Sequence, residues 1–200
     1  AVGEAGRVVA FEVNPKTVRE LEYTLALNNC TNVTVVPHGV SDTSRDDTLV
    51  VCVQATGTSS LDPRIRERLR RNEEVTEVLV KLQPLVYYIE TEHLPLPTFV
   101  KIDVEGFEGL VIDGMRSVLK QCHPRLYIEI HGVDHAQKTE HGLHVVKVLE
   151  EEGYRIFHIE KQIPIIERNR GEAKEGHIFA EYITTVSSKS SVYESGNSTT

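Results

Sequence analysis

Short apolar runs alternate with segments of helical periodicity in the first part of the chain. The run at 7–13, RVVAFEV, precedes Asn14-Pro15 and is typical of a strand covered on both faces. Asn14 is placed to cap a helix that begins at Pro15 and extends to about residue 28. A second apolar run at 32–37 predicts another strand. Strand, helix and strand in this order form a βαβ unit, so we expect these two strands to be parallel.

The same alternation continues to the end of the apolar sequence. Further strands are predicted at 48–54, 75–82, 98–103, 125–131, 154–160 and 177–183, and the run at 98–103 has the character of a buried strand. Helices are predicted at 63–74, 108–121 and 141–152. This order predicts an α/β fold and a single domain over 1–184. Residues 185–200 are rich in Ser and Thr, and we expect them to form a disordered tail.

Composition narrows the classes of function. The net charge of -8 argues against a general nucleic-acid binder or a protein that binds anionic membranes, and favours a small-molecule substrate. The 3 cysteines are widely spaced and form no metal-binding or disulfide pattern, so a reducing, cytoplasmic setting is expected. No apolar run approaches the roughly 20 residues that a membrane-spanning helix needs.

Acidic residues stand at the carboxyl ends of two predicted strands. Glu12 ends the first strand, where an acid can accept hydrogen bonds from the hydroxyls of a nucleotide ribose. Asp103 and Glu105 follow the strand at 98–103, and Gly106 would allow a tight turn or a close approach to a ligand. These acids suit a cationic ligand group, a metal or general-base chemistry. Alternatively, Asp103 caps the following helix, and Glu105 and Glu108 favour its positive end.

A carboxylate and an imidazole end another predicted strand. Glu129 and His131 alternate with Ile130, so their side chains share one face of the strand. If this strand adjoins the one that ends at Asp103, the two sets of polar groups converge. The histidines and Asp134 in HGVDHAQKTEHGLH match no strong zinc pattern, and a polar loop with the start of a helix is the better interpretation.

Several blocks of sequence, taken in order, resemble the FkbM-type methyltransferases. The blocks are GRVVAFEVNP, TLALNNCTNVTVV, GVSD, VKIDVEGFE, VIDGM and LYIEIHG, and they lie between Gly6 and Gly132. The resemblance implies a Rossmann-like class I methyltransferase sheet, mostly parallel with an antiparallel C-terminal strand. It also implies S-adenosylmethionine as cofactor and a small-molecule or carbohydrate acceptor, methylated on a hydroxyl oxygen.

The resemblance assigns roles to individual residues. The residues implied in cofactor binding are Glu12, Val13, Asn14, Asp42 and Asp103. Glu12 would hold the ribose, and Asp103 would lie near the methionine end. Glu105, Glu129 and His131 would lie nearest the acceptor as the catalytic residues, and Glu105 or His131 would withdraw the hydroxyl proton. Four of these residues, Asp103, Glu105, Glu129 and His131, could hold a divalent ion, but the resemblance requires no metal and none is assigned.

The beginning of the chain departs from the family pattern. Family members carry a first strand and a Gly-rich loop ahead of the block that matches 1–6, and neither is seen here. We therefore expect an N-terminally truncated sheet whose strands ending at Glu12 and Asp103 either stay unpaired or pair directly. Such a chain should bind the cofactor weakly. A non-catalytic remnant or binding module on the same scaffold is the main alternative, and a nucleotide-sugar or dinucleotide enzyme is a third.

Overall fold

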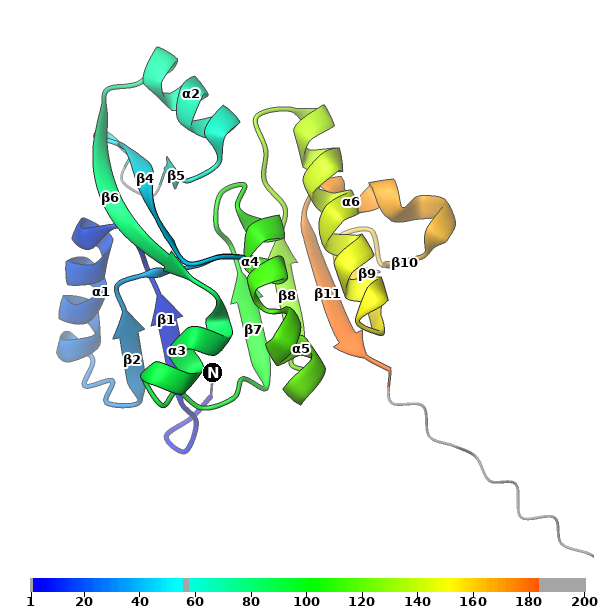
Figure 1. The fold of residues 1–200 in the computed structure, drawn as a ribbon, viewed down its shortest axis with the longest axis horizontal. Helices are drawn as coiled ribbons and strands as arrows, with labels where there is room; N and C mark the ends of the chain where they lie inside the picture. Colours follow the sequence, from blue (N-terminus) through cyan, green and yellow to red (C-terminus); the bar gives the residue numbers. More distant parts are fainter. Residues whose placement is uncertain (1, 56–57, 184–200) are drawn as a thin grey trace, which may run out of the picture.

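The computed structural model describes residues 2–55 and 58–183 and has an α/β architecture (Figure 1). Strand β1 (Val8–Phe11) pairs in parallel with β2 (Val33–Val36), and α1 (Pro15–Leu27) connects them. Asn14 caps α1 because its side chain accepts a hydrogen bond from the Lys16 amide at 3.0 Å. The predicted βαβ unit and its cap are confirmed.

A second sheet has the strand order β3-β6-β4-β5. Its members are β3 (Gly39–Val40), β4 (Arg45–Cys52), β5 (Ser59–Ser60) and β6 (Val75–Gln83). Helix α2 (Pro63–Asn72) packs against β4 through the buried side chains of Ile65 and Leu69, as its apolar spacing predicts. Helix α3 (Leu85–Thr91) follows β6.

The largest sheet has the order β10-β9-β11-β8-β7. Its strands are β7 (Phe99–Ile102), β8 (Arg125–Glu129), β9 (Tyr154–His158), β10 (Ile163–Ile165) and β11 (His177–Tyr182). Strands β7 and β8 are parallel, whereas β11 lies between β8 and β9 and is antiparallel to both. The other elements are α4 (Glu108–Gly114), α5 (Arg116–Cys122), α6 (His135–Glu151) and the 3₁₀ segment η1 (Glu167–Lys174).

The predicted mostly parallel sheet is wrong for the described residues. The strands form three separate sheets, with three parallel pairings and five antiparallel ones. The long pair β4 and β6 accounts for much of the difference, because Arg45 to Cys52 run antiparallel to Val75 to Leu82. An apolar run predicts a strand but carries no information on the direction of its neighbour.

Two predicted helices differ from the structure. The helix expected at 108–121 is interrupted at Met115, where the backbone leaves the regular helix with φ -100° and ψ -5°, and α4 and α5 result. The helix expected at 141–152 begins earlier, at His135, because the Asp134 side chain accepts a hydrogen bond from the Gln137 amide at 2.8 Å. The cap lies in the polar stretch that predicted a loop and the start of a helix. Elements α3, β3, β5, β10 and η1 were not predicted.

The main core joins the five-stranded sheet to the helices beside it. Leu126 and Ile128 of β8 and Val145 and Leu149 of α6 are fully buried in this core. Strand β7 is less buried than predicted, and Phe99 is 51% exposed. The half-buried β1 also lacks the predicted cover on both faces. The reason is that, among described residues, β1 pairs only with β2 and β7 only with β8, which leaves one edge of each free. Within the described ranges, no helix is both long and apolar enough to cross a bilayer.

Candidate functional site

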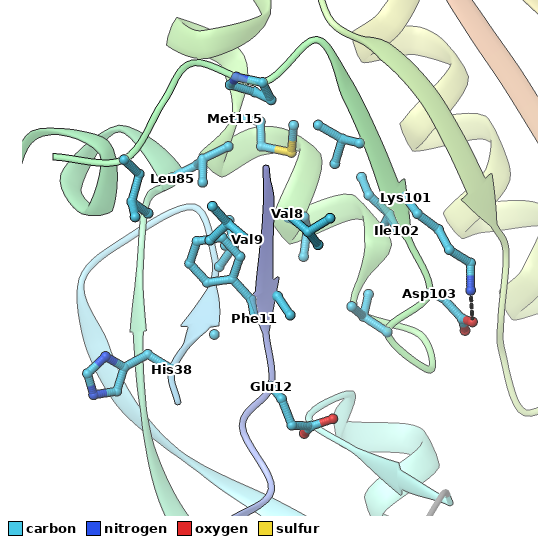
Figure 2. Close-up of a pocket in the computed structure, with 18 of the residues that line it drawn as sticks. Val8, Val9, Phe11, Glu12, His38, Leu85, Lys101, Ile102, Asp103 and Met115 are labelled. Carbon is cyan, nitrogen blue, oxygen red and sulfur yellow. Dashed lines mark hydrogen bonds and ion pairs between the residues drawn. The ribbon is translucent and has the colours of Figure 1, made fainter. Parts of the chain in front are cut away.

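A cavity of about 990 Å³ lies between the free edges of β1 and β7 (Figure 2). Its walls are mainly apolar, and the lining residues include Val8, Val9, Phe11, Leu85, Val100, Ile102 and Met115. The lining spans the full length of both strands, from Arg7 and Phe99 to Glu12 and Asp103. The cavity is therefore a long apolar slot with carboxylates at the end where the two strands finish.

Four predicted site residues face this cavity, namely Glu12, Val13, Asp103 and Glu105. Glu12 follows β1, and its Oε1 accepts a hydrogen bond from the Asn14 amide at 2.7 Å. Figure 2 shows Glu12 at the end of β1 and Asp103 at the end of β7, beside Lys101, and both residues line the cavity. The carboxyl ends of β1 and β7 thus each contribute an acid to the lining of one cavity, as the sequence placed them at strand ends.

Two other predicted cofactor residues lie outside the lining of this cavity. Asn14 is 3% exposed and lines a smaller hollow beside α1, and its Nδ2 has no hydrogen-bond partner among the described residues. Asp42 accepts hydrogen bonds from Arg45 at 2.7 Å and from Ser41 at 2.9 Å. Burial opposes ionisation of Asp42, but these hydrogen bonds prevail and hold its pKa below the usual value.

A strained turn carries Glu105 to the cavity. Glu105 and Gly106 both have positive φ, at 50° and 95°. A side chain on Gly106 would place its Cβ 2.5 Å from Ile65 Cδ1, so α2 packs directly against the backbone of this turn. The Ser60 hydroxyl donates to the Glu105 carbonyl at 2.7 Å and fixes the turn from the other side. The expectation that Gly106 serves a tight turn is confirmed, whereas Asp103 does not cap α4, whose N-cap residue is Phe107.

Glu108 and His131 form a hydrogen-bonded pair at the site. The Glu108 side chain is fully buried, and its Oε1 lies 2.8 Å from Nδ1 of His131. The same oxygen accepts a hydrogen bond from the Gly106 amide at 2.9 Å. Because a carboxylate only accepts, Nδ1 carries the hydrogen, and Nε2 of His131 is directed away from Glu108.

Nε2 of His131 faces three carboxylates. It lies 3.5 Å from Glu129 Oε1, 3.8 Å from Asp103 Oδ1 and 4.0 Å from Glu105 Oε1. Strands β7 and β8 are parallel neighbours, so the predicted convergence of their polar ends is confirmed. Burial of the ring opposes protonation, but the hydrogen bond to Glu108 and the nearby carboxylates prevail and raise the pKa of His131. Burial is also the largest cause that raises the pKa of Glu105, against the opposing charge of His131.

Two residues that were not predicted, Lys101 and His177, contact the carboxylate oxygens of Asp103 and Glu129 that point away from His131. Lys101 Nζ donates to Asp103 Oδ2 at 2.7 Å, and His177 Nε2 lies 3.2 Å from Glu129 Oε2. His177 also contacts Glu160 through Nδ1, and the pKa of Glu160 falls to about 2 chiefly because of that hydrogen bond. The alternation of Lys101 with Ile102 places it on the same face as Asp103 and was a usable signal. His177 had no such signal, because its place depends on how β11 enters the sheet.

A buried polar network supports the site from the side of α6. Gln137 is fully buried, and its Nε2 donates to Asp62 Oδ1 at 2.9 Å. Asp62 also caps α2 by accepting from the amides of Arg64 and Ile65. His141 Nδ1 lies 2.8 Å from the His131 carbonyl oxygen, which ties α6 to the end of β8. This network fixes the position of the His131 backbone.

Comparison with protein families matches residues 1–156 to the methyltransferase FkbM domain. The chain belongs to the FkbM methyltransferase family. The blocks from which the resemblance was inferred all lie within the matched range.

Among solved structures, the chain is similar to a methyltransferase FkbM from Methylobacillus flagellatus KT, with a TM-score of 0.50 and 18% identity. The match covers 88% of this chain and 36% of that one. At this identity the likeness supports the fold of an FkbM family member, and the chain spans well under half the length of the solved protein. Comparison with curated proteins gives no match.

Proposed function

We propose that the protein catalyses S-adenosylmethionine-dependent methylation of a hydroxyl oxygen on a small molecule or sugar. The observation that carries the proposal is that Glu12 and Asp103 face one cavity from the carboxyl ends of β1 and β7. In open α/β sheets this edge is where ligands bind. Membership of the FkbM methyltransferase family supports the choice of reaction.

The residues present fit the cofactor on the sides that β1 and β7 supply. Glu12 keeps its Oε2 available for a ribose hydroxyl while Oε1 is held by the Asn14 amide. Val13 and the buried Asn14 would lie beside the adenine, with Asp42 on the same side. Asp103 would lie near the positively charged methionine end, where a carboxylate is favourable. When bound, S-adenosylmethionine supplies a methyl group carried on a positively charged sulfur.

Glu105 is the residue that we assign as general base. It lines the cavity, whereas His131 lies behind it, and its raised pKa makes it a stronger base than an ordinary carboxylate. As the acceptor oxygen forms its bond to the methyl carbon and the carbon–sulfur bond breaks, Glu105 takes the hydroxyl proton. Positioning of the acceptor at the strand ends by Glu129 and His131 would contribute a further part of the rate.

We also propose that a further strand of the natural protein occupies the slot between β1 and β7. The free edges of both strands, the exposed Phe99 and a cavity that follows the strands along their whole length support this. Such a strand would satisfy both edges and place a loop at the end near Glu12 and Asp103. The consequence is that the 200-residue chain binds the cofactor weakly.

The test is methyl transfer by protein made from the complete reading frame. Transfer of labelled methyl from S-adenosylmethionine is measured against a panel of hydroxylated small molecules and sugars. Glu105→Gln should slow single-turnover transfer by roughly 10²- to 10⁴-fold, and Glu12→Ala should weaken cofactor binding by about 10- to 100-fold. Glu22→Gln, at an exposed position on α1, is the matched control. If the complete protein neither binds the cofactor nor labels any acceptor, the non-catalytic alternative replaces this proposal.

A further inference from the structure

Three side chains at the carboxyl ends of β7 and β8 each place one potential metal-ligand atom close to the other two. They are Asp103, Glu129 and His131, and their potential ligand atoms all lie within 4.8 Å of one another. His131 Nε2 lies 3.5 Å from Glu129 Oε1 and 3.8 Å from Asp103 Oδ1. Both distances exceed the roughly 2.7–3.2 Å of an ordinary N–H···O hydrogen bond, so Nε2 makes no short contact with either carboxylate.

The opposite atom of each side chain is held by a residue outside the cluster. Glu108 holds Nδ1 of His131, Lys101 holds Oδ2 of Asp103, and His177 contacts Oε2 of Glu129. Metal-binding histidines and carboxylates are characteristically fixed in this way, with the second nitrogen or oxygen engaged by a neighbour. A surface cluster of acids would not need outer partners for all three side chains. Here these partners hold the outer atoms and leave His131 Nε2, Asp103 Oδ1 and Glu129 Oε1 free to bind a ligand.

We propose that Asp103, Glu129 and His131 bind a divalent cation of the Mn²⁺ type. Two carboxylate oxygens and one imidazole nitrogen suit Mn²⁺, because carboxylates favour hard cations and imidazole favours transition metals. Small divalent cations hold such ligands at about 2.1 Å, so adjacent ligand atoms lie about 3 Å apart. The two distances from Nε2 therefore have to shorten by less than about 1 Å, which small side-chain rotations of Asp103 and Glu129 provide while Lys101 and His177 still contact their outer oxygens.

Cation binding would also balance the charge of this edge. Asp103, Glu105 and Glu129 lie around Nε2, and the buried Glu108 adds a fourth carboxylate behind the ring, whereas the charge of Lys101 on Asp103 offsets only one of the four. Glu108 strengthens the imidazole as a ligand by holding the proton on Nδ1, so it is a positioning residue for the metal. Three protein ligands leave further coordination positions for water or for oxygens of a bound molecule.

The role of the cation in catalysis rests on the proposed function, whereas binding of the cation does not. Held beside Glu105, a divalent cation would orient the acceptor hydroxyl and make its proton easier to remove. His131 is then a ligand through Nε2, which agrees with the assignment of Glu105 as base. The cofactor is not needed to detect the metal, so the two proposals are tested by separate measurements.

The test is titration of the metal-free chain with MnCl₂, followed by calorimetry and by electron paramagnetic resonance of free Mn²⁺. We expect one site per chain. Glu129→Gln and His131→Ala should each reduce affinity by at least about 10-fold, and Glu108→Gln by about 10- to 100-fold. His144→Ala is the matched control, because His144 also pairs with a carboxylate, Asp113, but lies outside the cluster.

Circular dichroism in EDTA establishes that each variant is folded before it is titrated. Binding of Mn²⁺ that is lost in the cluster variants and kept in His144→Ala supports the site, whether or not any methyl transfer is found. Absence of a stoichiometric site in the folded wild-type chain, or equal loss in His144→Ala, overturns the proposal. Methyl transfer that proceeds unchanged in EDTA, together with stoichiometric binding, contradicts the catalytic role alone.

Discussion

The imidazole of His131 is hydrogen-bonded through Nδ1 to Glu108, a carboxylate with no exposed surface, at 2.8 Å. The pair joins the end of β8 to the first turn of α4. Its energetic value depends on the second partner of Glu108, the Gly106 amide, which donates to the same oxygen. Removal of this side chain leaves the buried Gly106 amide and the partly buried Nδ1 of His131 without an acceptor.

Glu108→Ala should therefore destabilise the metal-free protein by about 2–4 kcal/mol. Glu108→Gln should cost clearly less, because its amide oxygen still accepts from Gly106 or His131. The measurement is urea unfolding in EDTA, followed by circular dichroism. Equal costs for the two variants would contradict this account, because the amide oxygen kept in Glu108→Gln would then contribute nothing to stability.

Gly106→Ala should destabilise the protein by about 2–3 kcal/mol, through the strained φ and the close approach of α2. The added Cβ would lie 2.5 Å from Ile65 Cδ1 at a φ of 95°. Gly171→Ala is the control, since no heavy atom lies within 4 Å of its built Cβ. Both are compared by denaturant midpoint, and a Gly106→Ala cost no larger than that of Gly171→Ala would contradict the account of the turn.

Glu160 provides a prediction for acid stability. The hydrogen bonds from the His177 side chain and amide lower the pKa of Glu160 to about 2. A lowered folded-state pKa contributes stability above the unfolded value of about 4.3, and this contribution is lost as the pH falls toward 2. The difference in melting temperature between wild type and Glu160→Gln should therefore shrink between pH 6 and pH 2.5. Glu22→Gln serves as the control, and a difference that stays constant with pH would contradict the prediction.

The cavity between β1 and β7 gives a prediction for ligand binding. On the proposal that a further strand fills the slot, the 200-residue chain should bind S-adenosylmethionine with a Kd weaker than about 100 μM, because β1 and β7 would supply only two sides of the site. The measurement is calorimetric titration of the isolated chain. Micromolar affinity would show that β1 and β7 alone form a sufficient site and would remove the need for a further strand.

Strand ends were the part of the site that could be predicted from sequence. Parity along a strand is a local property, so the shared face of Glu129 and His131 and the position of Asp103 followed from the residues themselves. Their convergence needed only that β7 and β8 be parallel neighbours, as the structure has them. The assignment of individual residues to the cofactor stays a prediction.

Groups that arrive from distant parts of the chain could not be predicted. His177 reaches Glu129 across 48 positions of sequence, and Gln137 reaches Asp62 across 75. Both contacts depend on which strands pair and on where α6 docks, and the spacing of apolar residues predicts neither. The same limit explains why strand direction in the sheet of β4 and β6 was missed.

The position of β11 has a consequence for how the chain is made. Strands β8 and β9 do not pair with each other, and each is paired with β11, the last strand of the described residues. During synthesis both strands leave the ribosome before residues 177–182 are available. Until then, the backbone groups of β8 and β9 that pair with β11 have no hydrogen-bond partner. The sheet closes only after its C-terminal strand is released. Loss of β11 would therefore separate β10 and β9 from β8 and β7, whereas loss of an edge strand would leave the rest of the sheet paired.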